Sequence, residues 1–146
     1  RFGLDTSEFL DPPSSYSSFN NFFVRKLKPE ARPLSHGAVM PADARYRFYP
    51  EVHANDSFSV KNKTFCLRSV LQNEELAERY EGGSLVMARL CPTDCHRFYF
   101  PFDCTPGPAR LINGKLFSVN PIAIKDNPWI WGVNRRMLTI CSSQEF

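Results

Sequence analysis

The sequence predicts an α+β fold that is mainly β, with short N-terminal helices followed by a mostly antiparallel β domain. Short runs of apolar or alternating residues recur along most of the chain and are separated by Gly, Pro and Asn, as in strands joined by turns. Helical spacing of apolar residues is confined to a few short segments, the first of them near residue 19. No internal repeat or low-complexity segment suggests another architecture.

Size and charge narrow the class of protein. The 146 residues correspond to one domain, and a net charge of +3, from 18 basic and 15 acidic residues, is too small to indicate nucleic acid as a partner. Every apolar run is shorter than the ~20 residues of a membrane-spanning helix. Five cysteines, an odd number with apolar neighbours, favour reduced thiols. Because the chain starts at Arg1 and stops at Phe146 after an apolar run, we expect it to be part of a longer protein.

Residues 1–16, rich in Ser and Pro, predict an irregular lead-in, and residues 17–146 predict one partial domain whose C-terminal part is missing. A helix is expected to begin at Ser17 or Ser18, since either hydroxyl can accept a bond from an unpaired backbone N–H. It should end before Pro29, because the residue before a proline is disfavoured in a helix. Its apolar stripe consists of Phe19, Phe22, Phe23 and Leu27.

The end of this helix carries Arg25, Lys26 and Lys28, which predict an exposed basic tip. The first interpretation is an ordinary solvated helix end, where cations complement the helix dipole. The alternative is attraction to anionic lipid, worth about 1 kcal/mol for each basic residue near such a surface.

Extended segments follow. Residues 45–49 alternate in polarity and predict a strand that Pro50 closes, with Asp43 in a turn at its start. Residues 58–60 predict a short second strand, and Asn62-Lys63 predicts a turn after it.

One or two short helices are expected over residues 66–80, where Asn73 can cap the second. Gly82-Gly83-Ser84 then predicts a turn before a buried strand at residues 85–90.

Turns and strands are also expected in the last third of the chain. Thr105 to Pro108 predicts a turn, and Asn113-Gly114 predicts a β-hairpin. Residues 115–120 and 137–142 are the last predicted strands. The aromatic loop Asn127 to Trp131 either covers the core, which we favour, or contacts acyl chains.

Residues 89–101 place a dense group of polar side chains between two apolar runs: Asp94, Cys95, His96, Arg97 and Tyr99. Neighbouring groups shift the pKa values of titratable side chains that lie at the edge of a core, and such shifts are common in active sites. A structural histidine is the alternative for His96. A third interpretation adds Cys91 and Cys104 to form a zinc site. We predict no metal there, because Cys95 and His96 point to opposite faces if the segment is extended.

Five segments, in this order along the chain, resemble the signature motifs of the phosphatidylserine decarboxylase family. Arg89-Leu-Cys-Pro-Thr-Asp-Cys-His-Arg-Phe-Tyr-Phe-Pro101 resembles R-L-x-P-x-D-Y-H-R-x-H-x-P. Residues 19–33 resemble F-N-D-F-F-x-R-K-L-K-P-x-A-R-P, and Pro41-Ala-Asp43 resembles P-A-D-G. Residues 114–121 and 134–136 resemble G-x-L-F-S-V-N-P and N-x-R. The chain is therefore identified as a member of this family, as an N-terminal, β-subunit portion that ends before the processing serine.

The resemblance implies a pyruvoyl-dependent lyase that converts phosphatidylserine to phosphatidylethanolamine and CO2 in phospholipid biosynthesis. Family members are zymogens that cleave themselves at a serine, which becomes the pyruvoyl cofactor. Its carbonyl takes up the electrons left when CO2 departs. An Asp, a His and the serine form the self-cleavage triad, and Asp43 matches the Asp. His96 matches the histidine that lies beside the pyruvoyl group and the substrate.

The resemblance also implies partners and a location. We expect phosphatidylserine as the substrate, the chain's own C-terminal α-subunit segment, a membrane surface and a homodimer as partners, and no nucleic acid. The expected location is the cytoplasmic face of a bacterial membrane.

Two residues depart from the family pattern. Tyr99 stands where the family has the triad histidine, and Ala44 stands where it has glycine. A tyrosine pKa near 10 is about three units too high for a base at pH 7, which corresponds to roughly 4 kcal/mol. Tyr99 could still hold Asp43 or the substrate by a hydrogen bond.

No serine of this chain fits the processing site. Ser84 follows two glycines but precedes His96, whereas the processing serine of the family lies far downstream of that histidine. The pyruvoyl group would thus come from a serine not present in this chain, and we expect the chain alone to be inactive. The alternative is a catalytically decayed, decarboxylase-like module that binds lipid, with Tyr99 as the mark of decay.

Overall fold

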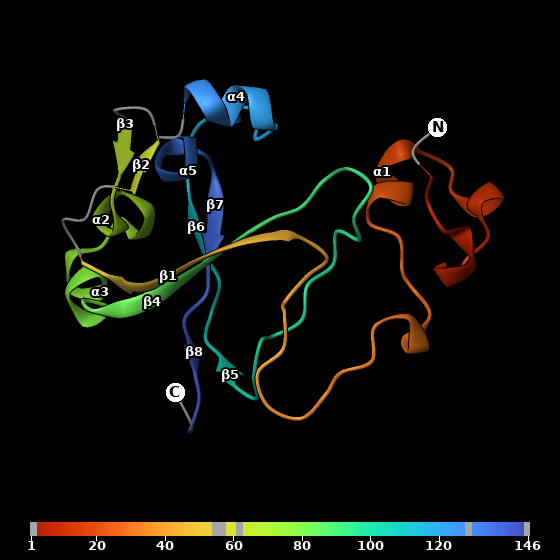
Figure 1. Ribbon diagram of the computed structural model, residues 1–146, viewed down its shortest axis with the longest axis horizontal. Coiled ribbons are helices and arrows are strands. Elements are labelled where there is room, and N and C mark those ends of the chain that lie inside the picture. The colour runs from red at the N-terminus through yellow and green to blue at the C-terminus, as the bar shows by residue number, and fades with distance from the viewer. Residues whose placement is uncertain (1–2, 54–57, 61–62, 128–129, 145–146) are drawn as a thin grey trace. The chain divides into compact units, whose positions relative to one another are not determined.

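The computed structural model describes residues 3–53, 58–60, 63–127 and 130–144. The chain folds into two compact units (Figure 1). The first unit comprises Arg1–Arg47, Val86–Thr105 and Ser143–Phe146, and the second comprises Phe48–Leu85 and Pro106–Ser142. Short helices and antiparallel strand pairs confirm the α+β class. The helices are not strictly N-terminal, because α2 (Leu67–Leu71) and α3 (Glu74–Arg79) lie in the predicted helical region at residues 66–80 and two more of the described helices follow near the C-terminal end.

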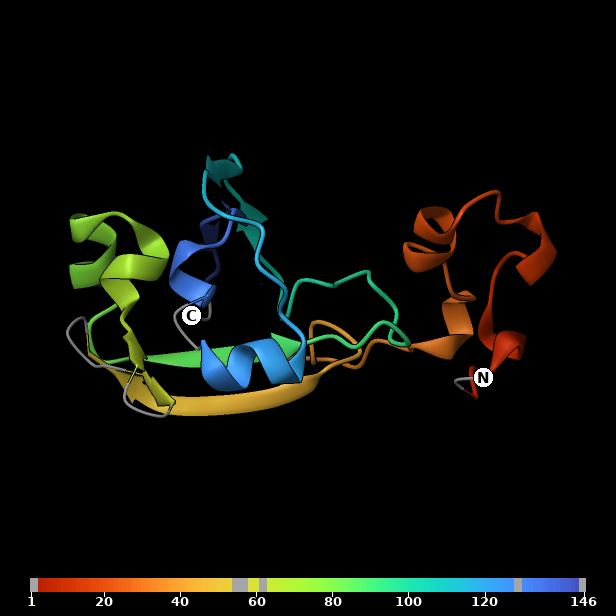
Figure 2. The same cartoon turned by 90° about the horizontal axis from the view of Figure 1, so that it is seen from above.

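The helices are η1 (Thr6–Glu8), η2 (Pro13–Ser15), α1 (Phe19–Phe23), η3 (Pro29–Ala31), α2 (Leu67–Leu71), α3 (Glu74–Arg79), α4 (Pro121–Asp126) and α5 (Ile130–Val133), where η denotes a 3-10 helix. The strands are β1 (Arg45–Val52), β2 (Phe58–Val60), β3 (Lys63–Phe65), β4 (Gly83–Arg89), β5 (Thr105–Pro106), β6 (Arg110–Ile112), β7 (Arg136–Leu138) and β8 (Cys141–Ser142). In the described ranges they pair as β1 with β4, β2 with β3, β5 with β8, and β6 with β7. Figure 2 shows β1 and β4 side by side from above.

Helix α1 begins where the sequence predicts and ends earlier. The Ser18 hydroxyl accepts a bond from the Asn21 N–H at 3.1 Å, which confirms the predicted cap. Leu27 is not helical, because its backbone forms an antiparallel bridge with Phe9. Phe19 is 71% exposed, so the predicted apolar stripe is only partly buried.

Strand β1 continues through Pro50 to Val52, so the prediction that Pro50 closes it is wrong. A proline is tolerated in a strand where no neighbour requires its N–H, as at the edge of a two-stranded sheet. The Pro50 carbonyl accepts a bond from the Ser84 hydroxyl at 2.6 Å. Gly82, with φ at 73°, forms the predicted turn before β4. Its N–H bonds to the Val52 carbonyl at 2.9 Å.

The predicted helices between residues 66 and 80 are α2 and α3. Asn73 caps α3, because its side-chain oxygen accepts a bond from the Leu76 N–H at 2.9 Å. Lys63 pairs with Val60 as the first residue of β3, and Asn62 of the predicted turn lies outside the described residues. Residues 85–89 of the predicted strand lie in β4, which ends one residue earlier than predicted and is half-buried, since Val86 is 48% exposed.

Two arginines on paired strands hold the C-terminal end of α2 in the second unit. Arg136 donates to the carbonyls of Ser69 and Val70, both at 2.7 Å, and Arg110 donates to the Leu71 carbonyl at 2.8 Å. Burial, with Arg110 as a second cause, lowers the pKa of Arg136. Together the two arginines bond the last three carbonyls of this helix. The core of this unit consists of Val52, Leu67, Leu71, Ala77, Ile112 and Ile130.

Asn113-Gly114 does not form the predicted hairpin, because β6 pairs with β7 and not with the next segment. Gly114 instead permits a close approach: a Cβ there would lie 2.2 Å from the Val133 carbonyl oxygen. Lys115 forms a parallel bridge with Asn134, and residues 116–119 form no strand, which corrects the prediction for 115–120.

The Asn134 side chain holds the segment that follows Gly114. It accepts a bond from the Phe117 N–H at 3.0 Å and donates to the Phe117 carbonyl at 2.8 Å. A side-chain amide thus takes the place of a strand partner. Of the predicted aromatic loop, residues 128 and 129 lie outside the described ranges, and Ile130 is buried, 2% exposed.

The Gly114 contact predicts a graded loss of stability. Gly114→Ala should lower the free energy of unfolding by about 1–3 kcal/mol, because its methyl group overlaps the Val133 carbonyl. Gly107→Ala is the matched control, since its Cβ would lie 3.1 Å from the Ile140 carbonyl oxygen. Urea unfolding followed by circular dichroism measures both. Equal unfolding midpoints for the two variants would contradict the close approach at Gly114.

Candidate active site

The three site residues proposed from the sequence all lie in the first unit. Asp43 occupies a turn before β1, and His96 and Tyr99 follow β4 on a segment without regular structure. The Tyr46 hydroxyl closes the turn, because it accepts a bond from the Ala42 N–H at 2.9 Å and donates to the Ala42 carbonyl at 2.5 Å. The Tyr99 N–H bonds to the Pro41 carbonyl at 2.7 Å, which ties the two segments together.

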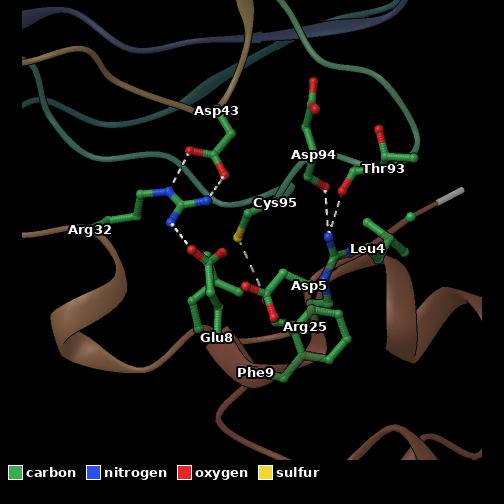
Figure 3. Close-up of a pocket in the computed structure, with 12 residues that line it drawn as sticks. Leu4, Asp5, Glu8, Phe9, Arg25, Arg32, Asp43, Thr93, Asp94 and Cys95 are labelled. Carbon is green, nitrogen blue, oxygen red and sulfur yellow. Dashed lines mark hydrogen bonds and ion pairs between the residues drawn. The ribbon is translucent and has the colours of Figure 1, made fainter.

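Asp43 is held by Arg32 through both carboxylate oxygens (Figure 3). The Arg32 Nε and Nη2 atoms donate to Oδ1 and Oδ2, each at 2.8 Å. This hydrogen-bonded pair lowers the pKa of Asp43 below its usual value, against the opposing effect of burial. The Cys95 backbone N–H and the charge of Arg25 act in the same direction. Asp43 is therefore a fixed, ionised carboxylate at neutral pH.

Asp43 and Tyr99 face the same cavity. This cavity has a volume of about 380 Å³, and its lining also includes Arg32, Met40 and Ala42. Ala44, the second departure from the family motif, needs no glycine, because its φ is not positive.

His96 is held by a ring and a carbonyl. Its imidazole lies against the Phe23 ring, with centroids 3.6 Å apart and planes at 33°. The Nδ1 atom lies 3.0 Å from the Asp94 carbonyl oxygen. Since a carbonyl only accepts, Nδ1 must carry the proton in the neutral ring, and Nε2 is left to exchange protons. His96 is not among the residues that line the cavity shared by Asp43 and Tyr99.

Arg25 is not part of an exposed basic tip, which corrects the sequence prediction. Its side chain is buried, 4% exposed, whereas Lys26 and Lys28 are exposed. One guanidinium nitrogen donates to the carbonyls of Thr93 and Asp94, at 2.7 and 3.3 Å. The guanidinium also lies over two aromatic rings, those of Phe9 and Phe22, at 4.9 and 4.8 Å from their centroids.

The same residue is bonded through its backbone. The Arg25 carbonyl accepts from the Arg97 Nε at 3.2 Å and from the Cys95 thiol at 3.8 Å. Arg25 thus joins the end of α1 to residues 93–97 through both its side chain and its backbone carbonyl. The sequence prediction missed Phe23, Arg25 and Arg32 as supports of the site. Their signal was available, because all three lie in the motif at residues 19–33.

Within the described ranges, no group of three or more His, Cys, Asp and Glu side chains could hold a metal ion, and the Cys91, Cys95, His96, Cys104 set forms no such group. The same ranges contain no helix with the length and apolar character needed to cross a bilayer.

A fixed carboxylate and an imidazole with one defined tautomer are typical of sites for acid–base chemistry. A family model described as phosphatidylserine decarboxylase matches residues 19–146. A phosphatidylserine decarboxylase proenzyme of Chlamydia pneumoniae is 46% identical over 149 aligned positions, covering 100% of this chain and 50% of the relative. The proenzymes of Chlamydia muridarum and Chlamydia caviae are 45% and 47% identical, covering 100% and 97% of this chain, and 50% and 48% of the relatives. The chain belongs to the phosphatidylserine decarboxylase family, and it spans about half the length of these curated relatives.

Arg25 should be essential for stability in a way that its basic neighbours are not. Arg25→Met removes the charged hydrogen bonds to the Thr93 and Asp94 carbonyls, so we expect a loss of about 2–3 kcal/mol in unfolding free energy. Lys26→Met, at an exposed position, should change it by less than about 0.5 kcal/mol. Urea denaturation compares them, and similar losses for both would contradict the buried role of Arg25.

The lowered pKa of Asp43 predicts acid sensitivity. A carboxylate with a folded-state pKa below its unfolded value of about 3.9 stabilises the fold above that value, and this contribution is lost as the pH falls through the folded pKa. Asp43→Asn should therefore lower the free energy of unfolding at pH 7. Below about pH 4, the free energy of unfolding of the variant should fall less steeply with pH than that of the unaltered protein. Urea unfolding from pH 3 to 7 measures this, and an unchanged acid slope in the variant would contradict the assignment.

Proposed function

We propose that this chain supplies Asp43 and His96 to a pyruvoyl-dependent phosphatidylserine decarboxylase, which converts phosphatidylserine to phosphatidylethanolamine and CO2. The observation that carries the proposal is the Asp43 carboxylate, held ionised by Arg32 beside a cavity that Tyr99 also lines. Family membership and relatives named as proenzymes support it. The pyruvoyl group, which withdraws electrons from the bond to the departing CO2, would arise from a serine outside these 146 residues.

Asp43 serves self-cleavage in this proposal. An ionised carboxylate orients a neighbouring base and stabilises the charge that the base acquires when it takes a proton from the serine. Tyr99 occupies the position of that base and shares the cavity with Asp43. A phenol hydroxyl is a far weaker base than an imidazole at neutral pH. We expect self-cleavage that depends on Tyr99 alone to be slow.

His96 serves the decarboxylation step. The bond from Nδ1 to the Asp94 carbonyl and the contact with the Phe23 ring fix the imidazole, so Nε2 is the atom that accepts or donates a proton. In its protonated form, Nε2–H can donate to the carbonyl of a pyruvoyl group or to the substrate carboxylate. The residues present therefore fit the cofactor that the family implies.

The proposed partners follow from the proposed reaction. They are phosphatidylserine in a membrane surface, the segment that completes the length of the relatives, and a second copy of the protein. Relatives from Chlamydia support a bacterial setting, and we propose the cytoplasmic face of the membrane as the location. A second candidate function, a lipid-binding module without activity, is favoured by one observation, Tyr99 in place of the triad histidine.

Three substitutions separate these roles in a precursor that joins this chain to the segment completing the family length. Asp43→Asn should stop self-cleavage, and Tyr99→His should accelerate it by about 10²–10⁴-fold, the usual value of a general base. His96→Ala should leave cleavage intact and reduce decarboxylation. Gel shifts measure cleavage, and CO2 release from phosphatidylserine vesicles measures decarboxylation.

The 146-residue chain alone is the negative control and should release no CO2 above background. Rapid self-cleavage of the unaltered Tyr99 precursor would contradict the role given to position 99. A precursor that neither cleaves nor decarboxylates in any variant, yet binds the vesicles, would favour the lipid-binding module.

A further inference from the structure

Arg32 lies between two carboxylates and contacts each with different nitrogens (Figure 3). Its Nε and Nη2 atoms face Asp43, and Nη1 donates to the Glu8 Oε1 atom at 3.2 Å. Nη1 also donates to the Ala31 carbonyl at 2.6 Å. Because the guanidinium is planar, contacts at all three nitrogens leave it little freedom to rotate.

The Arg32–Asp43 pair borders two cavities. Both residues line the cavity that contains Tyr99 and a second cavity of about 280 Å³ that contains Glu8, Arg25 and Cys95. The side chains of Arg32 and Asp43 remain 34% and 27% exposed. At this exposure solvent screens part of the attraction, whereas the two parallel hydrogen bonds fix how the carboxylate is oriented.

We propose that Arg32 is a positioning residue for Asp43: its guanidinium fixes the carboxylate by both oxygens, and Glu8 fixes the guanidinium in turn. This inference rests on the proposed function, in which Asp43 orients the base of self-cleavage. Each carboxylate oxygen has two acceptor sites, so an oxygen bonded to Arg32 can still accept a bond from a base.

A lysine cannot reproduce this arrangement. Its ammonium is a point charge without a planar fork, so it would keep the charge beside Asp43 and lose the two parallel bonds. Arg32→Lys therefore separates geometry from charge, and Arg32→Gln removes both.

The other charged groups around Asp43 have defined effects. Arg25 lowers the pKa of Asp43 from the side of the smaller cavity, and the Cys95 N–H does so through a hydrogen bond. Asp5, Glu8 and Asp94 also line that cavity. Arg32 is the largest single cause of the low pKa of Asp43. Its removal should therefore raise that pKa even though Arg25 and the Cys95 N–H remain.

The first experiment titrates the Asp43 side-chain carboxyl by NMR in the 146-residue chain. In Arg32→Gln the midpoint should move to higher pH, whereas in Arg135→Gln, the same substitution at an exposed arginine of the second unit, it should not move. Glu8→Gln should keep the hydrogen bonds from Arg32 to Asp43, so the titration midpoint of Asp43 should move less than in Arg32→Gln. An unchanged midpoint in Arg32→Gln would overturn the inference.

The second experiment measures self-cleavage of the precursor between pH 4 and 9. Arg32→Gln should move the acid limb of the rate profile to higher pH. Arg32→Lys should keep the acid limb near that of the unaltered protein and lower the rate at pH 7 by about 10–100-fold through misorientation. A purely structural role would lower the rate evenly and leave the acid limb in place, and that result would overturn the inference.

Failure of the inference is distinguishable from failure of the proposed function. If Asp43→Asn cleaves at the unaltered rate, Asp43 has no role in processing and the proposed function is overturned at this residue. If Asp43→Asn blocks cleavage while Arg32→Gln keeps both the rate and the acid limb, only the role of Arg32 is overturned.

Discussion

The first unit depends on the burial of one guanidinium, that of Arg25. A buried charge is costly unless hydrogen bonds replace those of water, and Arg25 obtains two from the carbonyls of Thr93 and Asp94, while its buried Nε has no hydrogen-bond partner among the described residues. Those carbonyls belong to a segment far from α1 in the sequence, so the bonds bring the two together. The ring contact between Phe23 and His96 joins the same two segments, because Phe23 lies two residues before Arg25 and His96 two residues after Asp94. The position of a proposed catalytic imidazole therefore depends on a residue that takes no part in the chemistry.

Local features of the fold were predictable from the sequence, and those set by distant partners were not. The caps at Ser18 and Asn73 involve residues three positions away, so short-range rules were sufficient. The sequence alone does not show that Arg25 meets carbonyls 68 and 69 residues away, or that Gly114 meets Val133. The same division applies to the site. Asp43 and His96 were proposed from motif resemblance, whereas their supports depend on contacts visible only in three dimensions.

The family motifs divide into two physical kinds. The segments around Asp43 and His96 present titratable side chains that neighbouring residues hold in place by hydrogen bonds. The segments at residues 114–121 and 134–136 fix backbone: Gly114 allows a close approach, and Asn134 pairs with the chain beside it. Arg136 bonds to the end of α2. A substitution in the second kind of motif should therefore act on folding before it acts on catalysis.

The contacts of Glu8 and Phe9 bear on how this protein should be produced. The match to the family model begins at residue 19, so a boundary chosen from it would discard Glu8 and Phe9. Glu8 is an ion-pair partner of Arg32, and Phe9 is a buried ring against the Arg25 guanidinium. A protein that starts at residue 19 would keep every family motif. The Arg25 guanidinium would nevertheless lose the Phe9 ring that lies against it, and Arg32 would lose its ion-pair partner Glu8. Expression should therefore start at or before Gly3, and an affinity tag belongs at a distance from this segment.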